Sequence, residues 1–181
     1  MSNPAPGELE LVRGFVNTWD GEDRSDVFTS PEALRAWLAE HELLDPGAGE
    51  PTAGDLEHAV AVREALRAML RANHGHELDP AAPATLDEAA RRAQLTVRFT
   101  PTAAAAVEPL ADGVDGSLGR LLARVAAAMD DGTWPRLKVC PADDCQWAFY
   151  DRSRNRSAVW CDMKVCGNRH KVRTFRERQR S

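Results

Sequence analysis

The chain has 181 residues, a formal net charge of −5 and a hydrophobic fraction of 43%, which suits one ordinary domain or a domain with a small module. No apolar run approaches the ~20 residues that span a bilayer, which excludes a transmembrane protein. The charge is uneven, because residues 136–181 hold twelve Lys and Arg against five Asp and Glu, whereas residues 1–135 hold eleven against twenty-three. The acidic total therefore does not exclude a nucleic-acid partner, since only the local field acts within a Debye length of about 8–10 Å.

The first 135 residues are expected to be mostly helical. Apolar residues recur at helical spacing between residues 9 and 19. Ser30 followed by Pro31 is a typical helix start, and Ser117 has the same capping role ahead of a later apolar stripe. The pattern predicts further helices at about residues 30–44, 55–73, 86–93 and 117–129.

Two short strands are expected between the last two of these helices. Residues 95–99 alternate apolar and polar side chains, as a half-buried strand does, and residues 105–110 can pair with them across Pro101–Thr102. Pro109 would confine the second strand to an edge. The sequence thus predicts a helical N-terminal domain at 1–135 with a small β-hairpin.

All four cysteines of the chain lie within 27 residues near the C-terminus, namely Cys140, Cys145, Cys161 and Cys166. Two C-x4-C pairs on either side of a hairpin-length spacer are typical of a tetrahedral zinc site with four thiolate ligands. Two disulfides are the alternative, which would suit a secreted chain. The first residues lack the basic and apolar segments of an export signal, which favours a reducing cytosol, and therefore zinc.

Residues 136–181 are expected to form a treble-clef-like zinc finger, a β-hairpin followed by a C-terminal helix. The hairpin should pair Gln146–Tyr150 with Ala158–Trp160, and the helix should run from about Val165 to Gln179. So small a module buries too little apolar surface to fold firmly alone, and metal binding would supply the missing stability. The overall fold class is α+β, mainly α.

The segments C-P-A-D-D-C-Q-W-A-F-Y-D-R-S-R-N-R-S and W-C-D-M-K-V-C-G-N-R-H-K-V-R-T-F-R, within Cys140–Arg180, resemble the CGNR zinc finger. Phe15-Val16-Asn17-Thr18 and the helix at 30–44 resemble the ABATE domain that usually precedes this finger. Such proteins are described as stress-induced transcription regulators of bacteria. The resemblance implies one Zn²⁺ ion on the four cysteines and a regulatory role.

Four thiolates close the coordination sphere, so the predicted zinc is structural and not catalytic. Zn²⁺ with its four thiolates carries a formal charge of −2 that must be balanced, and Lys138, Lys164 and Arg169 are near the ligands in sequence. Gly167 and Asn168 are interpreted as structural support of the zinc knuckle, Gly167 by permitting a close backbone approach and Asn168 by tying the knuckle to the hairpin.

The C-terminal helix carries the strongest functional signal, because four arginines fall within a 60° stripe at 100° per residue. The expected DNA contacts are this stripe, one flanking lysine and the hairpin turn: Arg169, Arg173, Arg176 and Arg180; Lys171; and Arg152, Arg154 and Arg156. An adjacent apolar stripe, Val165, Val172 and Phe175, should seat the helix on the hairpin.

Other interpretations of the same residues stay open. A charge run is often only a solvated face, and the module can instead be an adaptor that docks an acidic protein. The aromatic residues at 147–150 and Trp160 can stack on single-stranded nucleic acid or RNA, although core and metal cover is the commoner role. The acidic domain can also shield the basic finger until a signal separates them.

No catalytic motif or convincing histidine cluster occurs, which argues against an enzyme. The sequence therefore predicts a cytoplasmic bacterial transcription regulator that binds double-stranded DNA through a zinc finger at 136–181. Its N-terminal domain is the candidate site for a small-molecule effector or for assembly, and a homodimer is compatible with this organisation.

Overall fold

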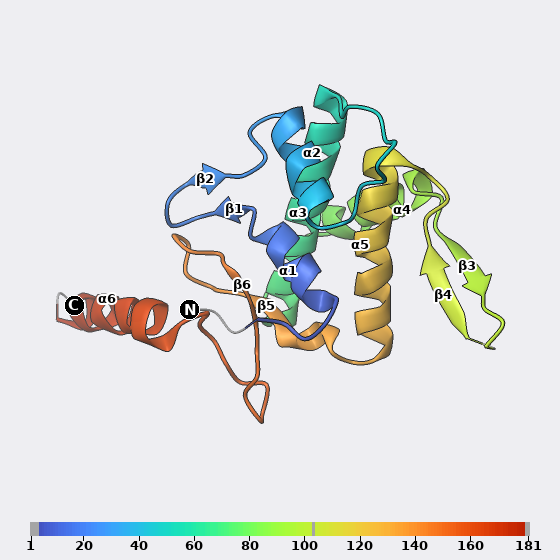
Figure 1. The fold of residues 1–181 in the computed structure, drawn as a ribbon. Coiled ribbons are helices and arrows are strands. Elements are labelled where there is room, and N and C mark those ends of the chain that lie inside the picture. The colour runs from blue at the N-terminus through green and yellow to red at the C-terminus, as the bar shows by residue number, and fades with distance from the viewer. Residues whose placement is uncertain (1–3, 103, 180–181) are drawn as a thin grey trace.

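A computed structural model describes residues 4–102 and 104–179 (Figure 1). The helices are α1 Leu9–Val16, α2 Pro31–Glu40, α3 Ala53–Asn73, α4 Ala81–Arg92, α5 Gly113–Asp130 and α6 Asn168–Arg178, with short helical turns at η1 Trp134–Arg136 and η2 Met163–Gly167. The strands of the described residues form three antiparallel pairs: β1 Trp19–Asp20 with β2 Ser25–Asp26, β3 Thr96–Phe99 with β4 Ala105–Glu108, and β5 Leu137–Val139 with β6 Ala148–Tyr150. The predicted class, α+β and mainly α, is confirmed.

Most of the helix starts that were predicted from capping residues agree with the structure. Ser30 caps α2, and Thr52 and Asp55 form a reciprocal capping box at the start of α3. The prediction for Ser117 is wrong, because α5 begins one turn earlier. Ser117 is fully buried inside that helix and donates its hydroxyl to the backbone oxygen of Leu43 at 2.9 Å, which ties α5 to the chain after α2.

The core lies around α3, which packs against α1, α2, α4 and α5 (Figure 1). Its largest fully buried side chains are Phe15, Leu34, Leu38, Leu43, Leu66, Leu70, Leu118, Leu121 and Leu137. Leu137 belongs to β5, so the start of the zinc module and the N-terminal helices share one apolar core. None of the described helices is long and apolar enough to cross a membrane.

The predicted pairing of residues 95–99 with 105–110 is confirmed, with Val97 opposite Val107 and Phe99 opposite Ala105. The expected half-burial of this hairpin is wrong. Phe99 is 84% exposed and Val97 is 56% exposed, since the hairpin extends beyond the helices (Figure 1).

The hairpin of the zinc module differs from the one expected. Ala148–Tyr150 pairs with Leu137–Val139 across the first cysteine pair, and residues 158–160 form no strand. The apolar strand before Cys140 supplies the better partner, because all residues of β5 and β6 are buried against the helices. Residues 151–160 instead form an irregular loop.

The C-terminal helix lies outside the main body (Figure 1). The prediction that Val165, Val172 and Phe175 seat it on the hairpin is wrong, because these side chains are 45%, 49% and 61% exposed. Its contact with the rest of the chain is at its start, where η2 leads into it and the His170 ring packs 4.9 Å from that of Trp160.

Candidate metal centre and its basic helix

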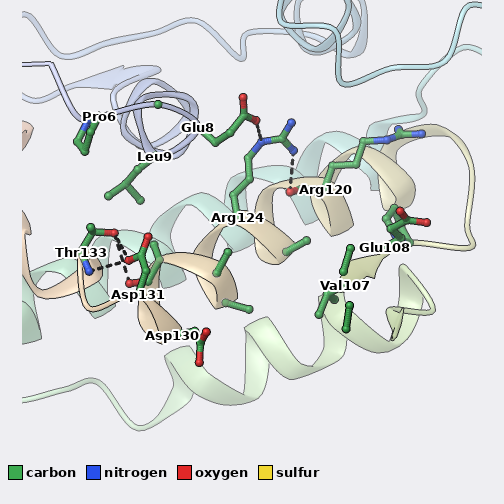
Figure 2. A pocket seen from close by; sticks show the side chains of 18 residues that line it. Pro6, Glu8, Leu9, Val107, Glu108, Arg120, Arg124, Asp130, Asp131 and Thr133 are labelled. Carbon is green, nitrogen blue, oxygen red and sulfur yellow. Dashed lines mark hydrogen bonds and ion pairs between the residues drawn. The ribbon is translucent and has the colours of Figure 1, made fainter. Parts of the chain in front are cut away.

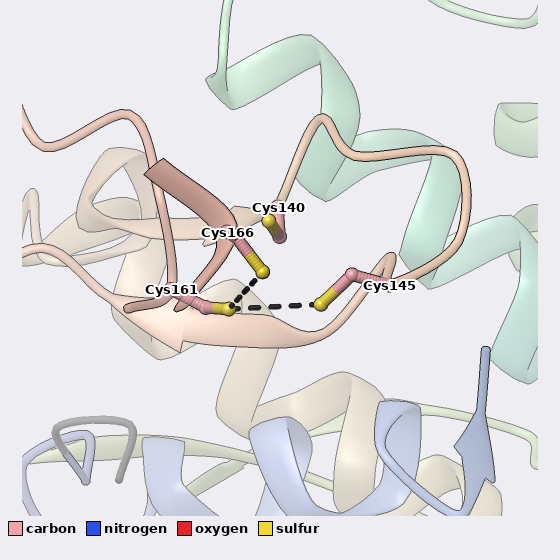
Figure 3. A group of neighbouring side chains, drawn as sticks. All are labelled: Cys140, Cys145, Cys161 and Cys166. Carbon is pink, nitrogen blue, oxygen red and sulfur yellow. Dashed lines mark hydrogen bonds between the residues drawn. The ribbon is translucent and has the colours of Figure 1, made fainter. Parts of the chain in front are cut away.

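The four cysteine side chains converge on one point (Figure 3). All four sulfur atoms lie within 4.8 Å of one another, and the Sγ of Cys161 is 3.6 Å from that of Cys145 and 3.7 Å from that of Cys166. A zinc–sulfur bond of about 2.3 Å gives a tetrahedron whose sulfur atoms are about 3.8 Å apart. All four cysteines are free thiols, so the cluster fits one structural zinc ion and not the disulfide alternative.

The strands β5 and β6 position the first pair of ligands, and η2 with its N-terminal cap positions the second pair. Cys140 follows β5 and Cys145 ends the tight turn before β6, with Cys140 N–H bonded to Trp147 O at 2.9 Å. Cys166 lies in η2, whose first turn is capped by the Asp162 carboxylate. Cys161, immediately before that cap, completes the set. The chain thereby brings two sequence-distant pairs onto one ion.

The protonation chemistry of the cluster favours a cation. Hydrogen bonds from Cys145 and Cys161 lower the pKa of Cys140 to about 2, because they stabilise its thiolate. The contacts with Cys140 raise the pKa of Cys145 to about 12 and also raise that of Cys161. Additional negative charges beside the first thiolate are unfavourable, and a bound Zn²⁺ would neutralise them and hold all four thiols deprotonated.

The N-terminal helices hold the first knuckle through its backbone. Arg67 of α3 is 3% exposed and donates to Gln146 O at 2.8 Å, beside Cys145, and to Val16 O at 2.7 Å. The Asn73 amide donates to Leu137 O at 2.9 Å, and His74 Nδ1 lies 2.7 Å from Val139 O. The end of α3 therefore fixes β5 and the first zinc knuckle relative to the core.

A second anchor comes from the Phe15-Val16-Asn17-Thr18 segment. The Asn17 side chain bonds twice to Ala148 of β6, accepting from its N–H at 2.7 Å and donating to its oxygen at 2.9 Å. A side-chain amide in this way satisfies the free edge of a strand. The supporting roles of Asn17 and Arg67 were not expected from the sequence. A polar residue at a helix end and an arginine on the buried side of α3 were the available signals.

The residues after Cys166 support the second knuckle locally. A Cβ on Gly167 would lie 2.5 Å from the Met163 sulfur and 3.1 Å from the Trp160 ring, so a side chain there requires both to shift. The Asn168 amide donates to Lys164 O at 3.0 Å within the same turn, rather than to the hairpin.

Arg169 links the metal centre to its acidic surroundings. Its guanidinium lies 3.5 Å from the Sγ of Cys166, 3.3 Å from Asp144 and 3.1 Å from Glu22 of the β1–β2 turn. Lys138 has a different role from the one expected, because its ammonium pairs with buried Asp151 at 2.7 Å. Lys164 is exposed.

Aromatic side chains shield the cluster from solvent. Trp147 and Trp160 pack against the buried cysteines, whereas Phe149 and Tyr150 are buried in or near the helical core. This arrangement favours the core interpretation of these rings over base stacking.

The remaining predicted basic contacts lie on two surfaces. Lys171, Arg173 and Arg176 are exposed on α6, and Arg173 and Arg176 line an open groove of about 1150 Å³ between this helix, the Pro141–Asp144 turn and residues 159–160. On the loop, Arg152, Arg154 and Arg156 are exposed, and Arg152 donates to Pro4 O at 2.8 Å. Arg180 lies outside the described residues.

A second, acidic surface lies beside the metal centre. A cavity of about 330 Å³ there is lined by Asp20, Glu22 and Asp162 together with three of the cysteines. A polyanion is therefore repelled from the β1–β2 side and attracted to the α6 side.

A helical N-terminal region joined to a closed four-thiolate knuckle and a basic helix defines a zinc-finger protein. Comparison with known families agrees with the geometry. Residues 136–179 match the CGNR zinc finger, and residues 9–131 match the ABATE domain, whose description reads "Putative stress-induced transcription regulator". The chain belongs to this ABATE family and carries its finger at the C-terminus. No curated protein matches the chain.

Proposed function

We propose that the protein is a transcription regulator that binds double-stranded DNA through its zinc-bound C-terminal module. The observation that carries this proposal is the surface of α6. Arg173 and Arg176 are exposed and line one groove. Guanidinium groups held on a helix suit phosphate contact and the reading of guanine edges in the major groove.

The zinc in this proposal is a scaffold. Its four thiolates leave no position for a water or a substrate, so the metal orients η2 and α6 and performs no reaction. We therefore propose a regulator and not an enzyme. The family description supports a regulatory role, with stress as the inducing condition, and a cytoplasmic site of action follows from a DNA target.

In the experiment, zinc-loaded protein first selects duplexes from a pool of genomic fragments. The binding constant K of one selected duplex is then measured across a salt series. Each phosphate contact contributes about 0.9 to the slope of log K against log salt. The double variant Arg173→Ala, Arg176→Ala should flatten the slope of log K against log salt by about two. It should also weaken binding at least tenfold at low salt. The matched control pairs Arg91→Ala with Arg98→Ala, which removes the same charge from two exposed arginines outside the module and should change neither quantity.

Failure of the zinc-loaded chain to retain any duplex at low salt would contradict the proposal. Competition by single strands or RNA that exceeds competition by duplex would assign the surface to unpaired nucleic acid instead.

A second candidate function is supported by the exposed apolar residues of α6. Val172 and Phe175 are 49% and 61% exposed beside the arginines, a combination that fits an acidic amphipathic protein segment. In that adaptor function the double arginine variant loses a protein partner while DNA retention is unchanged or absent. Loss of DNA retention with the partner still bound would favour the first function.

A further inference from the structure

The β3–β4 hairpin has an apolar face that nothing in the described chain covers. Alternation along the strands places Val97, Phe99, Ala105 and Val107 on one face, and all four are exposed. The other face is polar and carries an ion pair between Arg98 and Glu108 at 3.6 Å. A two-stranded hairpin is at best marginally stable alone, so an exposed apolar face of this kind indicates a binding surface.

The free edge of β4 presents unpaired backbone groups. Thr100 N–H donates to Ala104 O at 2.8 Å, so the bonded pairs of this ladder are Thr100 with Ala104 and, two residues on, Arg98 with Ala106. Ala105 and Val107 lie in the alternate, non-bonded positions. Their N–H and C=O groups therefore point away from β3, and they can accept another strand.

That free edge borders a large groove (Figure 2). The groove has a volume of about 1060 Å³ and is bounded by β4, by α5 and by residues 6–9 before and at the start of α1. Its α5 side carries Ala123, Ala126 and Ala127. Small side chains allow a backbone to approach closely, so an extended segment can lie along β4 and above α5.

The edge is complementary to itself. Natural edge strands use charges, prolines and bulges against pairing, and residues 105–107 carry none of these, whereas Glu108 and Pro109 mark the end of the unprotected stretch. A two-fold axis at Ala106 places Ala105 opposite Val107 of the second copy and Val107 opposite its Ala105. Both pairs then direct their free N–H and C=O groups at each other, with no like charges opposed.

We propose that β4 pairs antiparallel with β4 of a second copy of this chain, which forms a four-stranded sheet across a two-fold axis. A stable dimer buries about 800 Å² of each partner, more than one strand edge provides. The interface therefore extends beyond the strand edge into the groove along α5, and the two apolar hairpin faces become one continuous surface. This assembly does not depend on DNA binding.

The first test measures the molar mass of the zinc-loaded full chain without DNA, over a concentration series, by sedimentation equilibrium. The native chain should be a dimer. Val107→Pro removes an outward N–H without breaking the β3–β4 ladder, and it should raise the dimer dissociation constant at least tenfold. The matched control is Val97→Pro, which removes the corresponding N–H from the outer edge of β3 and should leave the mass unchanged.

The second test retains the hairpin and locates the axis. Antiparallel residues in a non-bonded pair have Cα atoms about 4.5 Å apart, which is within disulfide range. The two-fold axis places residue 106 opposite residue 106 of the second copy in such a non-bonded pair. Ala106→Cys should therefore form a disulfide between the two copies under oxidised glutathione, whereas Thr96→Cys on β3 and the native zinc-bound chain should not. A monomer at all concentrations would overturn the proposal. So would a dimer that survives Val107→Pro and fails to cross-link through Ala106→Cys.

Discussion

The contact between Lys138 and Asp151 shows how single residues hold the zinc module together. The Lys138 ammonium, 7% exposed, bonds to Asp151 Oδ2 at 2.7 Å and to Arg156 O at 2.7 Å, so it ties β5 to the loop that leads to Cys161. Burial alone would raise the pKa of Asp151, but Lys138 and Ser153 outweigh it and hold that pKa below its usual value near 3.8. The carboxylate is therefore charged at neutral pH and depends on its partner.

We expect Lys138→Met to lower the free energy of unfolding by about 3–5 kcal/mol at pH 7, because it leaves the Asp151 carboxylate buried and unpaired. Urea denaturation of zinc-loaded protein measures this change. Lys164→Met, at an exposed lysine between two zinc ligands, is the control and should cost less than about 0.5 kcal/mol. Adding Asp151→Asn to Lys138→Met should recover part of the loss, and equal effects of the two single lysine variants would refute this role.

Among the elements, β6 depends on a contact from far away in sequence. Asn17, at the end of α1, closes the edge of β6 with its two bonds to Ala148. We expect Asn17→Ala to lower the free energy of unfolding by about 1–3 kcal/mol, because a buried backbone N–H and C=O lose their partners. The same variant should release zinc to a chelator faster, since β6 begins three residues after Cys145.

Asn155→Ala is the matched control for Asn17→Ala, because Asn155 is exposed in the 151–160 loop. Chelator kinetics followed with a zinc indicator should be unchanged by Asn155→Ala. Unaltered kinetics for both variants would mean that Asn17 stabilises the helices without positioning the zinc knuckle.

The same contacts explain how far the sequence could predict these elements. The start of α2 at Ser30 and the strand at 95–99 depend on residues that are neighbours in the chain, so both were predictable from the sequence. The four-cysteine site was predictable because the spacing of the cysteines is that of ligands to one metal ion. The partner of β6 was not, because both candidate strands are short and apolar and only burial against α3 decides between them. The burial of Val172 and Phe175 was expected from a stripe pattern that does not specify what the stripe contacts.

At the scale of the whole molecule, the charge asymmetry does not fold the basic helix onto the acidic region. The Arg169–Glu22 ion pair joins them at 3.1 Å, while Arg173 and Arg176 remain exposed. The domain boundary between residues 135 and 136 stays a prediction. Side chains from both sides of it share one core, since the N-terminal helices pack with Leu137, Val139, Ala148 and Tyr150. The metal centre and the helical region are therefore expected to unfold together.

Metal removal tests that expectation. Zinc bound to the native state alone stabilises it by RT ln(1 + [Zn]/Kd), and the shared core transmits this stabilisation to the helices. We expect one calorimetric transition for the zinc-loaded chain, and a fall of at least 10 °C in its midpoint after chelation or in Cys161→Ser. Helical circular dichroism, which reports mostly on residues 9–130, should lose its signal at the same lowered temperature. Two transitions, with the helical one unmoved by chelation, would instead show that the finger and the N-terminal helices are independent folding units.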